Sequence, residues 1–406
     1  MNYLVAVDAS FVHNPGGMAR VAWDMARAAR DRGHEVGLIA ARPPGRTEPT
    51  VDEVEGICIA RYCRPRIANI DPRYIPRTFN NVHQTLGRFL SRRRWDVVHS
   101  HSPFTGLGAA RSLGPATRCV STIHSPVVLE RAVAWDQEGR TGLLKKRLMG
   151  PVLRFVEGRL LRRSHGLHTL SRFTRRQMGL FHGPGVERRV RVIPHWCREE
   201  QRRTLDRAEA RRRLGWPDDR KNLFTLRELG PRYGVDTAIR AVAPQVRAGA
   251  CHFHVAGRGA ARQQLERLAA ELGCADGVTF LGRISDEDLA LAYQAADLFL
   301  LPTAALECFG LIILEALSFG CPVLSTDSSA IPETMQDILP DFIVPAGDAA
   351  AMEHKVRQFL QGELTPPTND ELVQHVQQRY HRRVVVPRLF ELIEGTSNPM
   401  EQAHVQ

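Results

Sequence analysis

The chain has 406 residues, of which 43% are hydrophobic and 24% are charged, and its formal net charge is +11. This composition excludes an intrinsically disordered protein, because such chains contain too little apolar surface to form a core. One hydrophobic core rarely serves a chain of this length, so we expect two domains of roughly 150–200 residues each.

The first 40 residues predict a strand, a glycine loop, a helix and a second strand. Residues 3–10 form an apolar run, and Gly16 and Gly17 precede apolar residues that recur at helical spacing from 21 to 29. Residues 35–40 form the next strand. This order of elements predicts a Rossmann-like first domain.

The same N-terminal sequence bears on where the protein works. It contains no basic leader and no small-residue cleavage site, and no later segment reaches about 18 uninterrupted apolar residues. We therefore expect a cytoplasmic protein. The eight cysteines lack the close pairs of a zinc or redox motif, which predicts small buried side chains in a reducing compartment.

More strands follow in the first half, and each is followed by a segment suited to a helix. These strands are predicted at residues 96–101, 119–124 and 166–171. A parallel sheet with intervening helices accounts for the alternation. Because ligands bind beyond the carboxyl ends of parallel strands, we expect His101, His124 and Ser171 at the functional edge of this sheet.

Positive charge is concentrated in one region of the chain. Residues 141–215 contain 20 Lys or Arg against 6 Asp or Glu, a net charge of +14, which leaves −3 for the rest. Such a region favours an anionic partner, namely a phosphate, a nucleic acid or a membrane surface. Basic residues on ordinary solvated helices explain it equally well. Residues 143–163 alternate apolar and basic side chains, which suits a helix that contacts an anionic membrane.

The second half begins a new series of strands and helices. After a strand at 190–196 the sequence becomes polar and rich in arginine, which predicts a domain boundary. Helices such as 263–273 then alternate with strands, so the second half is predicted to be another α/β domain. Its strands are predicted at 223–229, 251–257, 278–282, 297–303, 322–327 and 342–346.

Residues 302–327 form the most informative segment. A loop carboxylate, Glu307, precedes Gly310 and an apolar helix that carries Glu315. Gly310 lets the backbone approach a ligand closely, and a helix starting there presents free N–H groups to a phosphate or a sugar oxygen. Glu315 is costly to bury unless it accepts hydrogen bonds, and ribose hydroxyls can donate them. The alternative is an exposed Glu307 and a Glu315 paired with an arginine.

This segment resembles the retaining glycosyltransferases of the GT-B fold, family 4. The resemblance rests on two glutamates separated by seven residues, Glu307 and Glu315, within PTAALECFGLIILEALSFGCPV. It extends to PGGMAR, DVVHSHSP, STIHSP, SRFTRR, RELGPRYGVD, VAGRG and VTFLGRISDEDL, and so covers residues 1 to about 395. It implies an α/β GT-B fold of two facing Rossmann-like domains with a deep interdomain cleft.

The resemblance also implies how the chain is divided. Residues 1–200 would form the acceptor-binding domain and residues 201–375 the nucleotide-sugar donor domain. Residues 376–406 would form a C-terminal helix that crosses back to the first domain.

Roles for individual residues follow from the resemblance. Gly16 and Gly17 would face the donor phosphates and the transferred sugar, although a plain strand-to-helix turn explains two adjacent glycines equally well. His124 would hydrogen-bond the sugar near the scissile bond, whereas a histidine at a strand end is more often structural. Glu307 would hold sugar hydroxyls and Glu315 the ribose. Further donor contacts would come from Gly257, Arg283, Ile284, Phe309, Gly310, Leu311 and Ile312, with the backbone near Arg283 and Ile284 contacting the nucleobase.

One departure from the family concerns the diphosphate. The family places an arginine and then a lysine before a glycine, both directed at the diphosphate. Here Arg227 matches the arginine, but Tyr233 occupies the lysine position. We expect Arg232 to take the place of the lysine, because a guanidinium binds phosphate through two parallel hydrogen bonds. The alternative is that both arginines are surface charges.

The function implied by the resemblance is transfer of a hexose-type sugar from UDP or GDP to a hydroxyl acceptor, with retention. Positioned charges can stabilise the leaving diphosphate and an oxocarbenium-like sugar without a covalent step. We expect no metal and no cofactor. The partners would be the nucleoside diphosphate sugar, a small hydroxylated or lipid-linked acceptor, and peripherally the anionic inner face of a membrane.

Two alternatives come from other classes of protein. The first is a GT-B-fold epimerase that acts on the sugar nucleotide itself. The second is a non-enzymatic nucleic-acid-binding protein, suggested by the charge of +14 in residues 141–215. This region lacks the interleaved aromatic residues of single-strand binders and any recognisable reading helix. We therefore expect no nucleic-acid partner.

Overall fold

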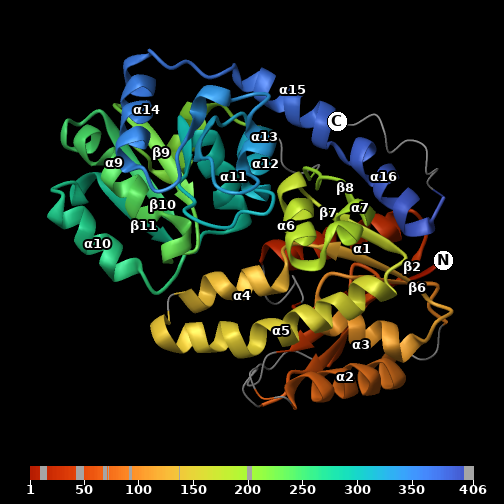
Figure 1. The fold of residues 1–406 in the computed structure, drawn as a ribbon. Coiled ribbons are helices and arrows are strands. Elements are labelled where there is room, and N and C mark those ends of the chain that lie inside the picture. The colour runs from red at the N-terminus through yellow and green to blue at the C-terminus, as the bar shows by residue number, and fades with distance from the viewer. Residues whose placement is uncertain are drawn as a thin grey trace. The chain divides into compact units, whose positions relative to one another are not determined.

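A computed structural model of the chain describes residues 1–9, 16–42, 50–66, 71, 73–90, 94–136, 138–198 and 204–396. The chain divides into two compact units (Figure 1). Unit 1 comprises Met1–Pro194 together with the chain from Val386 onward, and unit 2 comprises His195–Val385. Each unit contains one sheet surrounded by helices, so the prediction of two α/β domains is confirmed.

Unit 1 is built on a sheet of eight strands. They are β1 (Asn2–Val7), β2 (Glu35–Arg42), β3 (Val51–Val54), β4 (Ile57–Cys63), β5 (Val97–Ser100), β6 (Arg118–Ile123), β7 (Gly166–Thr169) and β8 (Val190–Val192). Their order is β3-β4-β2-β1-β5-β6-β7-β8. All neighbours pair in parallel except β3 and β4, which form an antiparallel hairpin at one edge. The expectation of a parallel sheet therefore needs correction at this edge.

The hairpin of β3 and β4 was not predicted from the sequence. Its two-residue turn consists of Glu55 and Gly56, whose φ angles are 50° and 75°. Two positive φ values suit the primed turns that join antiparallel strands. The usual signal for such a turn is Asn-Gly or Asp-Gly, and a glutamate at positive φ is uncommon, which explains why the pattern was missed.

Within the described part of unit 1, seven α-helices precede residue 194, a short π-helix (Leu86–Leu90) continues α2, and the C-terminal helix joins them. The α-helices are α1 (Gly17–Asp31), α2 (Tyr74–Thr85), α3 (Pro103–Leu113), α4 (Val127–Asp136), α5 (Gly139–Arg163), α6 (Arg172–His182), α7 (Pro184–Arg189) and α16 (Arg382–Glu394). From α16, the ring of Phe390 lies 6.2 Å from that of Tyr3, and Arg118 Nε donates to the carbonyl of Ile393 at 2.7 Å. These contacts explain why the end of the chain belongs to unit 1.

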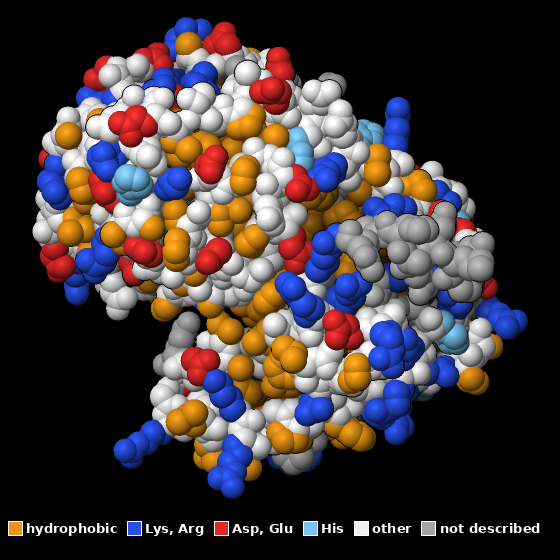
Figure 2. Space-filling view, turned by 45° about the horizontal axis from the view of Figure 1, so that its top comes forward, with side chains coloured by type: hydrophobic (Ala, Val, Ile, Leu, Met, Phe, Trp, Pro, Cys, Tyr) orange, Lys and Arg blue, Asp and Glu red, His pale blue; other side chains and the backbone are white. Residues whose placement is uncertain are grey.

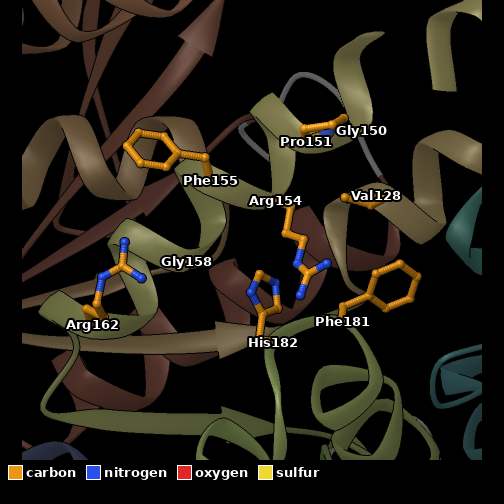
Figure 3. Close-up of a pocket in the computed structure, with 9 residues that line it drawn as sticks. All are labelled: Val128, Gly150, Pro151, Arg154, Phe155, Gly158, Arg162, Phe181 and His182. Carbon is orange, nitrogen blue, oxygen red and sulfur yellow. The ribbon is translucent and has the colours of Figure 1, made fainter. Parts of the chain in front are cut away.

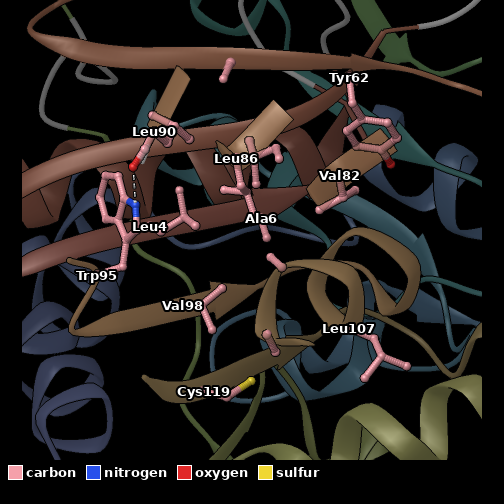
Figure 4. Packing of buried hydrophobic residues seen from close by; sticks show 14 of the residues in the cluster. Leu4, Ala6, Tyr62, Val82, Leu86, Leu90, Trp95, Val98, Leu107 and Cys119 are labelled. Atoms are coloured by element: carbon pink, nitrogen blue, oxygen red, sulfur yellow. Dashed lines mark hydrogen bonds between the residues drawn. The ribbon is translucent and has the colours of Figure 1, made fainter. Parts of the chain in front are cut away.

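One core cluster of unit 1 lies between the sheet and helices α2, α3 and α5 (Figure 4). Alternate residues of β1, such as Leu4 and Ala6, point into it because side chains alternate along a strand. Trp95 anchors one end, and its Nε1 donates to the carbonyl of Leu90 at 3.0 Å. A Cβ on Gly37 would lie 2.5 Å from the Trp95 ring, so this strand position requires glycine.

Unit 2 has a six-stranded sheet. Its strands are β9 (Lys221–Leu226), β10 (Cys251–Ala256), β11 (Val278–Gly282), β12 (Leu298–Leu301), β13 (Val323–Thr326) and β14 (Ile343–Val344). They pair in parallel in the order β11-β10-β9-β12-β13-β14. All six lie where the sequence predicted strands.

The helices of unit 2 connect these strands and follow them. They are α8 (Arg207–Leu214), α9 (Val235–Arg247), α10 (Arg262–Glu271), α11 (Asp286–Ala295), α12 (Leu311–Ser318), α13 (Ile331–Met335), α14 (Ala349–Gln361) and α15 (Asn369–Tyr380). Side chains cap several of them, including Ser285 on α11 and Thr368 on α15. Within the described part of the chain, we find no helix long and apolar enough to cross a membrane.

Candidate active site

The carboxyl edge of the unit 2 sheet gathers most of the residues predicted to bind a donor. β9 pairs in parallel with β10 on one side and with β12 on the other. The residues that follow these strands, Gly257, Arg227 and Thr303, therefore become neighbours although they are far apart in the sequence. This edge is where open α/β sheets bind ligands.

Arg227 and Glu307 form an ion pair at this edge. Arg227 Nη2 lies 2.9 Å from Glu307 Oε2, and the same nitrogen donates to the hydroxyl of Thr303. The side chain of Arg227 is only 8% exposed and that of Glu307 is 21% exposed. Burying a guanidinium is costly without a charged partner, so each side chain helps to hold the other in place. Glu307 is therefore not the exposed surface residue of the alternative interpretation.

The loop before Glu307 is held in an unusual conformation. The backbone N–H groups of Ala304 and Ala305 both donate to the carbonyl of Arg232, at 2.9 and 3.1 Å. Leu306 is buried and has a φ of 55°, which costs a non-glycine residue about 1–2 kcal/mol. Strain of this kind is concentrated at functional sites, where the surrounding structure maintains it.

Helix α12 begins directly after this loop. Gly310 has a φ of 84° and precedes the helix, and no side chain caps this N-terminus. The first N–H groups, those of Leu311 and Ile312, are therefore available to a ligand oxygen. Phe309 fixes the start of the helix, since its ring is buried near that of Tyr380 and its carbonyl accepts a hydrogen bond from Thr334.

Glu315 is the fifth residue of α12, and only 6% of it is exposed. The hydroxyl of Tyr293 donates to Glu315 Oε2 at 3.4 Å, which is a long hydrogen bond. A buried carboxylate is stable only when its oxygens accept hydrogen bonds. The buried Glu315, in the middle of α12, could therefore accept further hydrogen bonds from a ligand.

The two arginines predicted to contact a diphosphate are linked by an aromatic ring. The guanidinium carbons of Arg227 and Arg232 lie 5.3 and 4.8 Å from the centre of the Tyr233 ring. The hydroxyl of Tyr233 donates to Glu228 Oε2 at 3.0 Å. Burial raises the pKa of Tyr233, so this hydroxyl keeps its proton. Tyr233, which occupies the position of the family's lysine, therefore contacts both guanidinium groups.

Gly257 and the segment after β11 complete this edge of the sheet. Gly257 has a φ of 124°, and a Cβ there would lie 1.7 Å from the carbonyl oxygen of Arg227. Its N–H donates to the carbonyl of Gly282 at 2.7 Å. Arg283, which is exposed, and Ile284, which is half-buried, follow directly and precede α11. The strand order thus brings the predicted nucleobase loop to the edge that carries Arg227.

Unit 1 has its own cluster at the carboxyl ends of β5 and β6. His124 is half-buried, and its Nε2 lies 3.1 Å from Nδ1 of the buried His101. Below them, His99 Nε2 lies 2.6 Å from the hydroxyl of Thr122. Burial lowers the pKa of His99 well below its ordinary value, so that ring is neutral. A buried polar network therefore lies beneath His124, which is partly open to solvent.

Three other predicted positions of unit 1 differ in what they do. Gly17 is the first residue of α1, and among the described residues a Cβ on Gly16 or Gly17 would meet nothing within 4 Å. The described part of the fold therefore does not require glycine at either position. Ser171 has a structural role, because its hydroxyl caps α6 by accepting from the N–H of Thr174 at 3.2 Å.

Of the residues predicted to contact the donor, Gly16, Gly17 and His124 belong to unit 1 and the others belong to unit 2. Neither Thr303, which contacts Arg227, nor the bond between His101 and His124 was predicted from the sequence. The signal for both was available, since Thr303, His101 and His124 are each the last residue of a predicted strand. Across the described ranges, no group of three or more His, Cys, Asp or Glu is arranged to hold a metal ion.

Family models match both halves of the chain. Residues 15–201 match the model described as Glycosyltransferase Family 4, and residues 206–379 match the model described as Glycosyl transferases group 1. A phosphatidyl-myo-inositol mannosyltransferase of Mycobacterium leprae is 25% identical over 397 residues, 96% of each chain. A D-inositol 3-phosphate glycosyltransferase of Acidothermus cellulolyticus is 30% identical over 285 residues, and this match spans 66% of our chain and 61% of that relative.

Solved structures share the fold. A sucrose-phosphate synthase from Thermosynechococcus elongatus superposes with a TM-score of 0.80 at 20% identity, covering 98% of this chain and all of that one. HepE from Anabaena, solved in complex with UDP and glucose, superposes with a TM-score of 0.72 at 17% identity and covers 97% of this chain and all of that one. The two parallel-sheet domains therefore match the GT-B architecture, as predicted.

Proposed function

We propose that this chain, which belongs to the group 1 and family 4 glycosyltransferases, transfers a hexose-type sugar from a UDP-sugar or a GDP-sugar to a hydroxyl acceptor with retention of configuration. The observation that carries the proposal is the ion pair of Arg227 and Glu307 beside the uncapped start of α12. A cation for a leaving phosphate and a carboxylate for sugar hydroxyls thus lie within one hydrogen bond of each other.

The donor would bind along the carboxyl edge of the unit 2 sheet. The N–H groups at the start of α12 and the guanidinium groups of Arg227 and Arg232 would hold the diphosphate. Glu307 would accept hydrogen bonds from the sugar, and Glu315 from the ribose. The loop after β11 would contact the nucleobase. HepE, a structural neighbour, has been solved with UDP-glucose, which supports this class of donor.

The reaction exchanges one bond of the sugar carbon for another. The bond from the anomeric carbon to the diphosphate oxygen breaks, and the acceptor oxygen bonds to the same carbon on the same face. The departing diphosphate takes the acceptor proton. Arg227 and Arg232 would stabilise the negative charge that develops on the diphosphate, which is the usual source of the largest rate effect. His124, in unit 1, would hydrogen-bond the sugar near the scissile bond.

The acceptor we propose is a hydroxylated molecule, either small or lipid-linked. The names of two relatives contain inositol 3-phosphate and phosphatidyl-myo-inositol, which supports a polyhydroxylated acceptor in carbohydrate biosynthesis. We place the protein in the cytoplasm, peripherally at the inner membrane face. None of the eight cysteines forms a disulfide, which is typical of a reducing compartment.

A panel of sugar nucleotides measured by thermal shift tests the donor. A donor at 100 times its dissociation constant should add roughly 2.7 kcal/mol to the free energy of unfolding. The stabilising donor is then incubated with hydroxylated acceptors, and the product is analysed for its anomeric configuration. An isomerised sugar nucleotide without acceptor would instead indicate an epimerase. No stabilisation by any nucleoside diphosphate or its sugar would contradict the proposal.

A further inference from the structure

The outward face of α5 in unit 1 exposes an unusual number of apolar side chains. Among the residues that the structure describes, eight large hydrophobic side chains are exposed, and five of them lie on α5. Exposed apolar residues are ordinary when they are scattered, but a cluster marks an interaction site. The five are Leu143, Leu144, Leu148, Val152 and Phe155, with exposures between 38% and 64%.

Four of these residues form one continuous stripe. Leu144, Leu148 and Val152 recur every fourth residue, and Phe155 follows three residues later, so all four share one side of the helix. The opposite side is buried in unit 1, through residues that include Leu160. The apolar stripe therefore faces solvent and takes no part in the core.

Basic residues surround the apolar stripe. Helix α5 contains eight Lys or Arg, and its single acidic residue is Glu157. Glu157 is buried, where it accepts hydrogen bonds from His182 at 2.7 Å and from the N–H of Val127 at 3.0 Å. The exposed charge on α5 is therefore positive. Figure 2 shows Lys and Arg side chains in blue beside hydrophobic side chains in orange over the lower part of the view.

A pocket of about 580 Å³ opens beside the stripe, between α4, α5 and α6 (Figure 3). Arg154 and His182 point towards its middle, and Phe181 lies next to them. A Cβ on Gly158 would lie 3.7 Å from both Arg162 Nη1 and His182 Nδ1, so these two nitrogens converge on one point. The volume falls within the usual range of ligand pockets.

The cationic groups of the pocket are available to a ligand. Arg154 and Arg162 are exposed, and within the described residues neither forms an ion pair with Asp or Glu. His182 is held in place by Glu157. The aromatic and aliphatic residues of the wall, Phe155 and Phe181 among them, complement an apolar group next to an anion.

We propose that this face of unit 1 docks onto an anionic phospholipid surface. The pocket would receive a lipid phosphate between Arg154 and Arg162, and the apolar stripe would enter the boundary between headgroups and acyl chains. A bilayer explains both features at once, because a free phosphate leaves the stripe in water and a nucleic acid offers it nothing apolar. The docking surface lies entirely in unit 1, so it does not depend on the donor assignment.

Vesicle co-sedimentation of the full-length chain tests this proposal. The wild type should sediment with vesicles of phosphatidylglycerol and phosphatidylcholine, and remain in solution with phosphatidylcholine alone. Each basic residue at an anionic membrane contributes about fivefold to affinity, so Arg154→Gln with Arg162→Gln should weaken binding about 25-fold. Leu148→Ser with Phe155→Ser should weaken it at least tenfold at moderate salt, because the apolar contribution is not screened.

A matched pair of variants separates this surface from net charge. Arg240 and Arg267 are exposed on α9 and α10 of unit 2, and Arg240→Gln with Arg267→Gln changes the net charge by the same amount. This pair should reduce vesicle binding less than twofold. An equal loss in both arginine pairs, or no binding by the wild type at low salt, overturns the proposal. Full competition by glycerol 3-phosphate, with Leu148→Ser and Phe155→Ser binding as wild type, would replace the membrane by a soluble anion.

A second inference concerns Tyr233 and rests on the proposed function. Its ring lies within cation–π distance of both Arg227 and Arg232, and its hydroxyl is bonded to Glu228. We infer that Tyr233 is a positioning residue, which keeps the two guanidinium groups oriented towards the diphosphate. Such contacts of arginine with an aromatic ring stabilise a particular side-chain orientation as well as adding attraction.

The ratio of affinities for a nucleoside monophosphate and a nucleoside diphosphate reports this role. UMP with UDP, and GMP with GDP, are titrated against Tyr233→Leu and Tyr233→Phe. We expect Tyr233→Leu to weaken diphosphate binding about tenfold and monophosphate binding less than threefold, since the effect is on the arginines. Tyr233→Phe keeps the ring and should restore the wild-type ratio.

The outcomes distinguish this inference from the proposed function. An unchanged ratio in Tyr233→Leu, with the wild type still binding the diphosphate, refutes the positioning role alone. A Tyr233→Phe variant as weak as Tyr233→Leu assigns the effect to the hydroxyl and also refutes it. Failure of the wild type to bind any nucleoside diphosphate contradicts the function itself.

Discussion

Glu307 and Glu315 should respond differently to loss of charge. Glu307 lies in the loop before α12 and pairs with Arg227, whereas Glu315 is buried on the helix itself. Of these two carboxylates, only Glu307 contacts the transferred sugar in the proposed site, and the product nucleotide lacks this sugar. Glu307→Gln should therefore lower kcat and leave the affinity for the nucleoside diphosphate nearly unchanged, and Glu315→Gln should lower that affinity.

The structure decides which substitution is informative. Glu307→Ala would leave Arg227 buried without its partner, and breaking such a pair costs about 3–5 kcal/mol of stability. Glutamine keeps an oxygen within reach of Arg227 and removes only the charge. Converting a charge-assisted hydrogen bond to the sugar into a neutral one should lose about 1 kcal/mol. At 1.36 kcal/mol for each factor of ten, each such bond made in the transition state should account for about a fivefold fall in kcat.

For Glu315 the estimate concerns binding. Converting two charge-assisted hydrogen bonds to ribose into neutral ones should lose about 1 kcal/mol each. The sum of about 2 kcal/mol corresponds to a dissociation constant for the nucleoside diphosphate that is about 30-fold larger. The same loss should appear for the intact donor, because the ribose is common to both.

Isothermal titration of UDP and GDP, together with initial rates, measures both quantities. Glu353→Gln is a suitable control, because Glu353 is 28% exposed, pairs with Arg357 at 3.9 Å and lies on α14, outside the proposed site. It should alter neither turnover nor affinity. An equal loss of nucleotide affinity in Glu307→Gln and Glu315→Gln would contradict the separate roles. If both variants kept wild-type affinity and turnover, the donor would not bind at this edge of the sheet.

Three further predictions follow from the same structure. Arg227→Ala and Arg232→Ala should each reduce turnover about 100-fold in initial-rate assays, because each removes a contact to the leaving diphosphate. An unchanged rate in Arg232→Ala would show that Arg232 does not take the role of the family's lysine. His101→Phe should lower kcat at least tenfold with little change in nucleotide affinity, because the ring bonded to His124 would no longer orient it; equal rates in the variant would contradict this. Burial lowers the pKa of His254 to about 3, so acidification from pH 7 to 5 protonates this side chain in the unfolded state only. The free energy of unfolding, measured by urea unfolding, should therefore fall by about 2 kcal/mol between these pH values. This fall should be smaller in His254→Gln.

Local sequence was sufficient for most of the secondary structure. Apolar runs and glycine positions predicted all strands of unit 2 and most of those of unit 1, because strand and helix periods are properties of neighbouring residues. The prediction failed at the hairpin of β3 and β4, where Glu55 adopts a positive φ that its side chain does not signal.

The candidate residues were also accessible from the sequence, but their pairings were not. The spacing of Glu307 and Glu315 around Gly310 is a local pattern, and it predicted the loop and the helix that begin the proposed donor site. Nothing in the sequence predicted that Arg227 would pair with Glu307, 80 residues away. Nor did it predict the contact of the Tyr233 ring with Arg227.

Only the order of strands decides these pairings. β12 pairs with β9 although β10 and β11 lie between them in the sequence, and this crossover puts Thr303 and Glu307 beside Arg227. In the same way, pairing of β5 with β6 puts His101 against His124. The sequence by itself determined which residues can do chemistry and at which strand ends they lie. The tertiary structure decided which of them meet, because strand order depends on how whole layers of helices and strands pack.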